Sequence, residues 1–402
     1  MVQVWQLVVM LISVVLGLVS TAFSEQARAI APDGKTGTAQ AVVVPNVPLV
    51  QTTQLLPLDS QGRLLGNAGK QTSQLLKNLE KVLAEAGSGL QHLVRINLYI
   101  AQEEDIEEIG KQMGRLLKGR AFPTVTRVIT ALPAAGAKVA ADALAVAPAQ
   151  QRLAGVSYLS VASSASLPLA GLSILPAGRK VYVSGQAGRG QLLEATAKTM
   201  EELEGTLKFL GLGWEDVVQL KAFLHPVSRI EDVRGVMAGH IKNGKVPPLA
   251  FVEWISNLPI EIELVASGNS LADQWKSNEP VSYITPAGLT ASPVYSRVGV
   301  IHGGQSVYVS GMYGDTSDNA EQEVRSLFVQ LRELLKLAGT DFNHLVKATY
   351  YVASDRSSKL LNDLRPDFYD PKRPPAASKA MVKATGKKGH NLTLDMIAVA
   401  PD

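Results

Sequence analysis

The sequence predicts an α/β fold built from three copies of one module behind an N-terminal export segment. One stretch near residue 90 returns near residue 340 without gaps, and this is the first observation behind the prediction. The second is that helical and strand patterns follow one another in the same order in each copy. The third is an uncharged apolar run at the N-terminus. A chain of 402 residues has room for two to four domains, which fits three modules.

The repeat is visible directly in the residues. Leu83–Ala101 (LAEAGSGLQHLVRINLYIA) matches Leu335–Ala353 (LKLAGTDFNHLVKATYYVA), and Leu207–Leu224 (LKFLGLGWEDVVQLKAFL) falls in register with both. The ends of the first and third copies, Ala145–Pro148 and Ala398–Pro401, both read AVAP. The chain is therefore expected to fold three times into the same unit.

The elements of each copy follow in one order. A leading strand (Val181–Gly185 and Val307–Gly311) precedes a helix whose apolar residues recur every three or four positions. Gly87, Gly211 and Gly339 suit the left-handed residue that ends such a helix. After the glycine, a strand is expected at Val94–Ile100, Val217–Leu224 and Leu345–Val352, and a second helix at Asp105–Leu117, Ile230–Ile241 and Ser357–Phe368. A proline then opens another strand, at Pro123, Pro248 and Pro375. The final strand is expected at Val139–Val146, Ile260–Val265 and Leu392–Val399. This order predicts a mixed sheet with two helices on one face.

Short polar joins set the predicted boundaries. Residues 1–29 are expected to hold the export signal and its cleavage region, and residues 30–41 a lead-in. The three modules are expected at residues 42–148, 156–268 and 281–401.

The export prediction rests on the apolar run Leu7–Val19, which is followed by the small residues Ser20, Ala22 and Ser24. Its length is typical of a signal peptide and short for a membrane-spanning helix. No Lys or Arg precedes the run, so an uncleaved N-terminal anchor is the alternative. We expect an exported protein, periplasmic or secreted, without membrane contact once the signal is removed.

Composition excludes several classes of function. The formal net charge is only +3 and no block of basic residues occurs, so a nucleic-acid partner is not expected. The chain contains no cysteine, which excludes disulfides, thiolate metal sites and a cysteine nucleophile. His92 and His344 recur without a second recurring ligand, and neither a metal nor another cofactor is predicted.

Three segments carry a resemblance to a known family. Tyr182–Gln186 (YVSGQ), Ile260–Glu263 (IEIE) and Pro293–Arg297 (PVYSR) resemble motifs of the RidA family, also called YjgF or L-PSP. The resemblance implies a chorismate-mutase-like fold and a trimeric barrel with ligand sites in the clefts between neighbours. Three modules in one chain then imply an intramolecular pseudo-trimer that is a monomer in solution, with a small-molecule ligand between modules.

The family resemblance also implies hydrolysis of enamines and imines by means of an arginine two residues after the strand-opening proline. Val125, Ala250 and Ala377 occupy that position here. Two lost charge-assisted hydrogen bonds amount to about 3–6 kcal/mol, or roughly two to four decades in rate. We therefore expect a binding protein for an amino, imino or keto acid with little or no deaminase activity. A deaminase with altered chemistry is the alternative, and an endoribonuclease fits the charge less well.

Other family positions survive in part. Glu261 resembles the water-positioning carboxylate, Tyr295 the tyrosine near the module start, and Ser184, Gly185 and Ser310 the SGQ-type turn. The two serines also fit a purely turn-shaping role, and Glu261 fits a plain apolar–polar alternation.

Two cations lie two residues beyond the missing arginine. Arg127 and Lys379 are candidates for a shifted carboxylate anchor, because period two keeps them on the same strand face, whereas a solvated charge at a sheet edge is the alternative. Ala250→Arg is the restoring substitution that the sequence suggests, since the second copy keeps Glu261 and Ser184–Gln186.

Overall fold

Three mixed sheets, each backed by two helices, form the part of the chain that the computed structural model describes, residues 27–160, 169–241, 245–316 and 318–401. The apolar run Leu7–Val19 lies outside the described residues. Within those residues, no helix combines the length and apolar character that crossing a membrane requires. The predicted α/β class with two helices per sheet is confirmed.

The described residues contain three pairs of helices at the expected places. They are α2 (Ala68–Glu85) and α3 (Ile106–Leu117), α4 (Leu192–Leu210) and α5 (Ile230–His240), and α6 (Ala320–Leu337) and α7 (Asp355–Leu364). Gly87, Gly211 and Gly339 follow the first helix of each pair with φ of 68°, 80° and 83°, which confirms their predicted left-handed conformation.

Each sheet orders its strands in the same way. The first sheet runs β18-β5-β4-β6-β3-β8-β7, the second β11-β10-β12-β9-β14-β13 and the third β17-β16-β19-β15-β2-β1. The strands of the first sheet are β3 (Leu49–Thr52), β4 (Leu93–Ile100), β5 (Thr124–Ile129), β6 (Val139–Val146), β7 (Ser157–Leu159), β8 (Leu172–Leu175) and β18 (Ala384–Thr385). Those of the second are β9 (Lys180–Gln186), β10 (Val217–Leu224), β11 (Leu249–Glu253), β12 (Ile260–Ser267), β13 (Val281–Ile284) and β14 (Val298–Ile301). Those of the third are β1 (Arg28–Asp33), β2 (Thr38–Val44), β15 (Gln305–Met312), β16 (Leu345–Val352), β17 (Ala376–Met381) and β19 (Leu392–Ala400).

The leading hairpins of the copies are exchanged between sheets. β14 pairs with β9 of the second sheet although only three residues separate it from β15 of the third. β8 likewise pairs with β3 of the first sheet, and β2 with β15 of the third. The hairpin β1–β2, formed largely by the predicted lead-in, therefore joins the N-terminal region to the C-terminal sheet.

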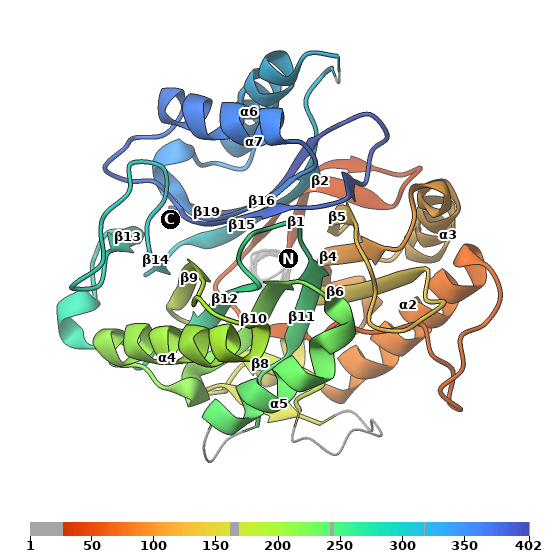
Figure 1. The fold of residues 1–402 in the computed structure, drawn as a ribbon, viewed down its shortest axis with the longest axis horizontal. Coiled ribbons are helices and arrows are strands. Elements are labelled where there is room, and N and C mark those ends of the chain that lie inside the picture. The colour runs from red at the N-terminus through yellow and green to blue at the C-terminus, as the bar shows by residue number, and fades with distance from the viewer. Residues whose placement is uncertain (1–26, 161–168, 242–244, 317, 402) are drawn as a thin grey trace, which may run out of the picture.

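The helices cover one face of each sheet, and Figure 1 shows the three helix pairs on the outside with the strands between them. The opposite faces meet in shared apolar clusters. Val94, Val218 and Val346, which are equivalent in the three copies, belong to one such cluster, and Tyr99, Phe223 and Tyr351 belong to another. Each sheet thus buries its second face against its neighbours, as a one-sided α/β layer requires.

Candidate functional site

Three interfaces, which we call clefts, form where one sheet approaches the next. In the second–third cleft, β17 lies against β9. In the first–third cleft, β5 lies against β15, and in the first–second cleft, β11 lies against the chain that follows β3. The position of the missing arginine falls on the edge strands β11 and β17 of the second and third sheets, and on β5 of the first sheet, which is followed only by the two-residue β18. Val125 and Ala250 are buried and Ala377 is half-buried among apolar side chains, so none of the three supplies a polar group.

The second–third cleft brings Glu261 onto the SGQ-type turn. The Gly185 amide donates to Ser378 Oγ of β17 at 3.0 Å, which joins the two sheets at this point. The Glu261 side chain lies directly over Gly185: a Cβ atom at residue 185 would be 1.9 Å from Glu261 Oε1. Only glycine leaves room for the carboxylate there, which gives the Gly185 backbone a direct role in positioning Glu261.

Glu261 has unusual electrostatics for a carboxylate. Burial and the neighbouring Glu263 raise its pKa to about 7, against smaller opposing effects of Lys347, Ser378 and Lys379. The side chain is only half-buried as a whole, yet its Oε1 atom is inaccessible to solvent and accepts no hydrogen bond. A carboxyl group with a pKa near neutrality is suited to exchange a proton with a ligand.

A buried ion pair supports Glu261 from within the protein. Lys347 Nζ of β16 lies 2.6 Å from Glu263 Oε2 of β12 and also donates to Thr349 Oγ1 at 3.2 Å. Burial opposes ionisation of Glu263, but Lys347 and Lys221 outweigh it and hold the pKa of Glu263 below its usual value. Glu263 therefore stays charged beside Glu261 and favours the protonated form of Glu261.

Cations face Glu261 from the other side of the cleft. Lys379, on β17, donates to Asn362 Oδ1 at 3.2 Å, and Arg365 Nη2 donates to the same oxygen at 2.6 Å. Burial and the positive charge of Arg365 lower the pKa of Lys379, while Glu261 acts in the opposite direction. The cleft thus places a carboxyl group and a lysine on opposing walls.

Tyr295 reaches this cleft because of the hairpin exchange. Its segment joins both walls: the Ser184 amide donates to the Arg297 carbonyl at 2.9 Å, and the Ser296 amide donates to the Pro375 carbonyl at 3.0 Å. The Arg297 guanidinium lies 5.1 Å from the centre of the Tyr295 ring. Ser184 Oγ is buried without a hydrogen-bond partner. The third copy therefore supplies its tyrosine to the cleft that holds the second copy's serine.

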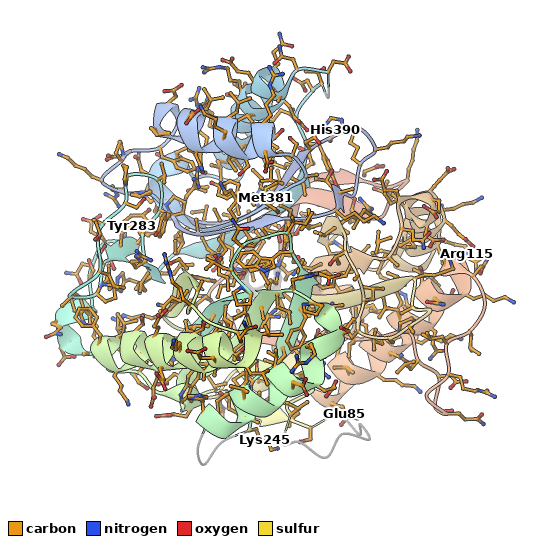
Figure 2. All side chains as sticks on the ribbon, in the orientation of Figure 1. Glu85, Arg115, Lys245, Tyr283, Met381 and His390 are labelled. Carbon is orange, nitrogen blue, oxygen red and sulfur yellow. The ribbon has the colours of Figure 1, made fainter. Side chains whose placement is uncertain are left out.

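The first–third cleft lacks the acid. Thr393 occupies the position equivalent to Glu261 and donates to the Met312 carbonyl at 2.9 Å. Arg127 lies near Tyr313, and its buried Nε atom makes no hydrogen bond. Strand β18, which precedes His390 (labelled in Figure 2), pairs with Val128 and Ile129 of β5, and the Gly386 amide donates to the Arg127 carbonyl at 3.0 Å. Ser310 pairs with Asp395 inside the sheet, and its Oγ atom has no partner.

The first–second cleft is closed by hydrogen bonds. Gln54 Nε2 donates to the Phe251 carbonyl at 3.1 Å, and the Phe251 amide donates to Gln54 Oε1 at 3.3 Å. Thr53 Oγ1 donates to the Leu249 carbonyl at 2.9 Å. Ala250 lies on β11 in this cleft, away from Glu261. The structure consequently moves the restoring substitution from Ala250 to Ala377, which shares a cleft with Glu261.

Sequence reasoning did not identify the residues that support Glu261 and Lys379. Ser378, Lys347, Asn362 and Arg365 belong to the third copy, and no local pattern marks them. Glu263 could have been found, because it repeats the period-two alternation of Glu261 on the same strand. Among the described residues, no group of three or more His, Asp or Glu is placed to hold a metal ion.

Surface concavities lie elsewhere. One of about 540 Å³ is lined by the start of α4, His225, Arg229 and Leu258, and one of about 660 Å³ by Val42, His92 and Phe122, among others. Neither of these two hollows is lined by an acidic side chain. A third hollow of about 460 Å³ is lined by Asp59, Lys77, Glu80 and Lys81, but it contains none of the positions that the family resemblance marks. The second–third cleft, which brings together Glu261, Gly185 and Ser184, is the stronger candidate.

Comparisons with known proteins match all three copies to one family. The model of a family described as endoribonuclease L-PSP matches residues 34–147, 170–267 and 286–400. The Schizosaccharomyces pombe protein mmf1, mitochondrial, is 38% identical over 56 residues, which are 14% of this chain and 35% of that relative. The chain thus spans about a third of the length of this curated relative.

Two solved structures are similar to part of the chain. A protein of unknown function of the conserved Rid protein family, YyfB from Yersinia pestis, is 24% identical with a TM-score of 0.27, covering 30% of this chain and 98% of that chain. Yeast Mmf1 is 19% identical with a TM-score of 0.24, covering 30% of this chain and 98% of that chain.

Proposed function

The chain belongs to the endoribonuclease L-PSP family, and we propose that it is a small-molecule-binding member whose ligand, an amino, imino or keto acid, lies in the second–third cleft. The observation that carries this proposal is the Gly185–Ser378 hydrogen bond between the two sheets, which brings Glu261, lying over Gly185, and Lys379, the neighbour of Ser378, to the same cleft. A carboxyl group and an ammonium group on opposing walls can bind the two ends of such a ligand, one through its carboxylate and the other through its oxo, imino or amino group.

The other clefts lack this pairing, and the difference supports a single site. At the positions equivalent to Glu261 and Lys379, the first–third cleft has Thr393 and Arg127, and the first–second cleft has Ala140 and Val252. A ligand in the first–third cleft would lack the interaction with the carboxyl group, and a ligand in the first–second cleft would lack both charged partners. We infer that only one of the three clefts is functional.

Weak or absent family-type catalysis is part of the proposal. The lost arginine would have held the substrate carboxylate through two hydrogen bonds, a loss of about 3–6 kcal/mol. The purified protein should therefore release little ammonia from 2-iminopropionate-type substrates. Ala377→Arg should raise the rate, because residue 377 opens onto the cleft that contains Glu261, and Ala250→Arg is the matched control in a closed cleft. Rapid turnover by the unmodified protein would contradict this part of the proposal.

A deaminase with altered chemistry is the second candidate. The pKa of about 7 favours it, since Glu261 could both give and accept a proton near neutrality. Measurable turnover that disappears in Glu261→Gln would support this candidate over simple binding. RNA cleavage is not favoured, because a formal charge of +3 is small for a protein that must bind a phosphate backbone.

Binding itself can be measured by titration calorimetry with pyruvate. Glu261→Ala should weaken pyruvate binding about tenfold or more, the worth of one charge-assisted hydrogen bond. Glu279→Gln changes an exposed acid in the join before the third module and should leave the affinity unchanged. Equal affinities in all three proteins would place the ligand somewhere other than this cleft.

We also propose that one chain completes the ring of three sheets by itself. The exchanged hairpins support this, because β1–β2 supplies the two outer strands of the third sheet and so links both ends of the chain. Tethered neighbours associate at a high effective concentration, which favours closure within one molecule. Light scattering should give the mass of one chain, and a trimer mass would overturn the proposal.

Export remains a proposal that rests on the apolar run Leu7–Val19. Arg28 and Ala29 belong to β1 and pair with Val43 and Val42. Cleavage after Ser24 would leave this strand whole, whereas cleavage after Ala29 would shorten it. N-terminal sequencing of protein recovered outside the cytoplasm should therefore begin near Glu25, and a soluble cytoplasmic form beginning at Met1 would refute the proposal.

A further inference from the structure

Asn362 holds two cations at the rim of the second–third cleft. Its Oδ1 atom accepts from Lys379 Nζ at 3.2 Å and from Arg365 Nη2 at 2.6 Å. Both nitrogen atoms lie within hydrogen-bond distance of one neutral oxygen, so they are close enough for a single carboxylate to bridge them. Asn362 itself is exposed, which leaves this point of the cleft open to solvent.

The two cations have no matching anion. Among the described residues, neither Lys379 nor Arg365 lies within ion-pair distance of an Asp or Glu side chain. The acid that most affects Lys379 is Glu261, which is partly protonated near neutral pH. Two positive charges that share only an amide oxygen repel each other, and a bound anion would relieve that repulsion.

Arg365 is fixed rather than mobile. Its side chain is only 4% exposed, and its guanidinium lies 5.0 Å from the centre of the Tyr350 ring. Tyr350 in turn shares a hydrogen bond between hydroxyl groups with Tyr369. The Nε atom of Arg365 is buried without a hydrogen-bond partner, so the group retains an unused donor. A guanidinium that is held rigidly beside Lys379 is preorganised to bind a carboxylate.

We propose that Arg365 and Lys379, held together by Asn362, form a carboxylate anchor that replaces the strand arginine missing at Ala377. This inference rests on the proposed function and assigns an orientation to the ligand. The carboxylate lies on Lys379 and Arg365, and the oxo or imino group points to Glu261. Arg365 comes from the turn after α7 and Lys379 from β17, so the anchor combines a cation from the helix layer of the third sheet with one from its edge strand.

Charge substitutions at the anchor test this directly. Asn362→Asp keeps the size of the side chain and supplies an internal carboxylate, so it should occupy the anchor and lower the affinity for pyruvate about tenfold or more. Lys379→Met should have a similar effect. Lys372→Met removes an exposed cation from the segment just before β17 and should change the affinity less than about twofold. Circular dichroism and thermal melting confirm that each variant folds.

Acetate separates this inference from the proposed function. Acetate needs only the anchor, whereas pyruvate also needs Glu261. If Asn362→Asp leaves pyruvate and acetate binding unchanged while Glu261→Ala weakens pyruvate binding, the anchor is wrong and the proposed function stands. If pyruvate and acetate bind with equal affinity, and both affinities fall in Asn362→Asp but not in Glu261→Ala, the anchor stands and the proposed function fails. Absence of pyruvate and acetate binding to the unmodified protein would overturn the anchor.

Discussion

Gly185→Ala should displace the Glu261 carboxylate from its position in the cleft without unfolding the protein. The added Cβ atom would lie 1.9 Å from Glu261 Oε1, 2.3 Å from its Cδ and 2.6 Å from its Cγ. Ordinary contact begins near 3.4 Å, so the carboxylate must withdraw by about 1.5 Å. The clashing atoms are the end of a flexible side chain rather than backbone, and the φ of Gly185 is not positive. The variant should therefore lose only about 1 kcal/mol of stability, the low end of the cost of an added methyl group.

The loss of free energy of pyruvate binding should exceed the loss of free energy of unfolding. Displacing Glu261 by that distance breaks its hydrogen bond to a ligand, which corresponds to roughly a 10- to 100-fold fall in pyruvate affinity. Calorimetry measures the affinity, and urea denaturation measures the free energy of unfolding. Gly205→Ala is the control, because a Cβ atom at that position in α4 meets no atom within 4 Å. Unchanged pyruvate affinity in Gly185→Ala would refute the assignment of Glu261 to the site.

Two further predictions concern the buried charges. Lys347→Met should lower the free energy of unfolding by about 3–5 kcal/mol, because Glu263 is left charged and unpaired. The double variant Glu263→Gln with Lys347→Met should recover much of that loss. If the effects of the two substitutions simply add in urea denaturation, the direct ion pair is contradicted. Burial and Glu263 raise the pKa of Glu261 from 4.5 to about 7, against the opposing effects of Lys347 and Lys379. Between these two pH values the folded protein binds more protons than the unfolded chain does. The free energy of unfolding should therefore fall as the pH rises from 4.5 to about 7. At about 1.4 kcal/mol per pKa unit, this fall is at most about 3.5 kcal/mol. Urea denaturation at pH 5 and pH 8 should show it in the unmodified protein and not in Glu261→Gln, and equal slopes would contradict the raised pKa of Glu261.

The supporting residues of the cleft show what a single sequence leaves hidden. Glu261 and Lys379 could be named because each keeps or neighbours a position in a recurring motif. Arg365 and Asn362 could not, since they lie on a helix and turn whose pattern indicates only an amphipathic element. Their importance comes from packing beside β17, and contact between distant elements is not encoded in local periodicity.

The sequence by itself determined the three modules, the order of their helices and strands, and the absence of the arginine at Val125, Ala250 and Ala377. These follow from residue identity and from periods of two and 3.6, which are local properties. Only the tertiary structure decided which sheet receives each leading hairpin. Connectors of three or four residues, such as His302–Gly304, are short enough to make an ordinary hairpin, yet here the chain passes from one sheet to the next. Strand pairing depends on which backbone lies alongside, and apolar alternation does not specify that partner. The exchange places the segment Tyr295–Arg297 beside Ser184, and the packing of β17 against β9 brings Lys379 to the cleft that contains Glu261, so that one cleft collects groups from two copies.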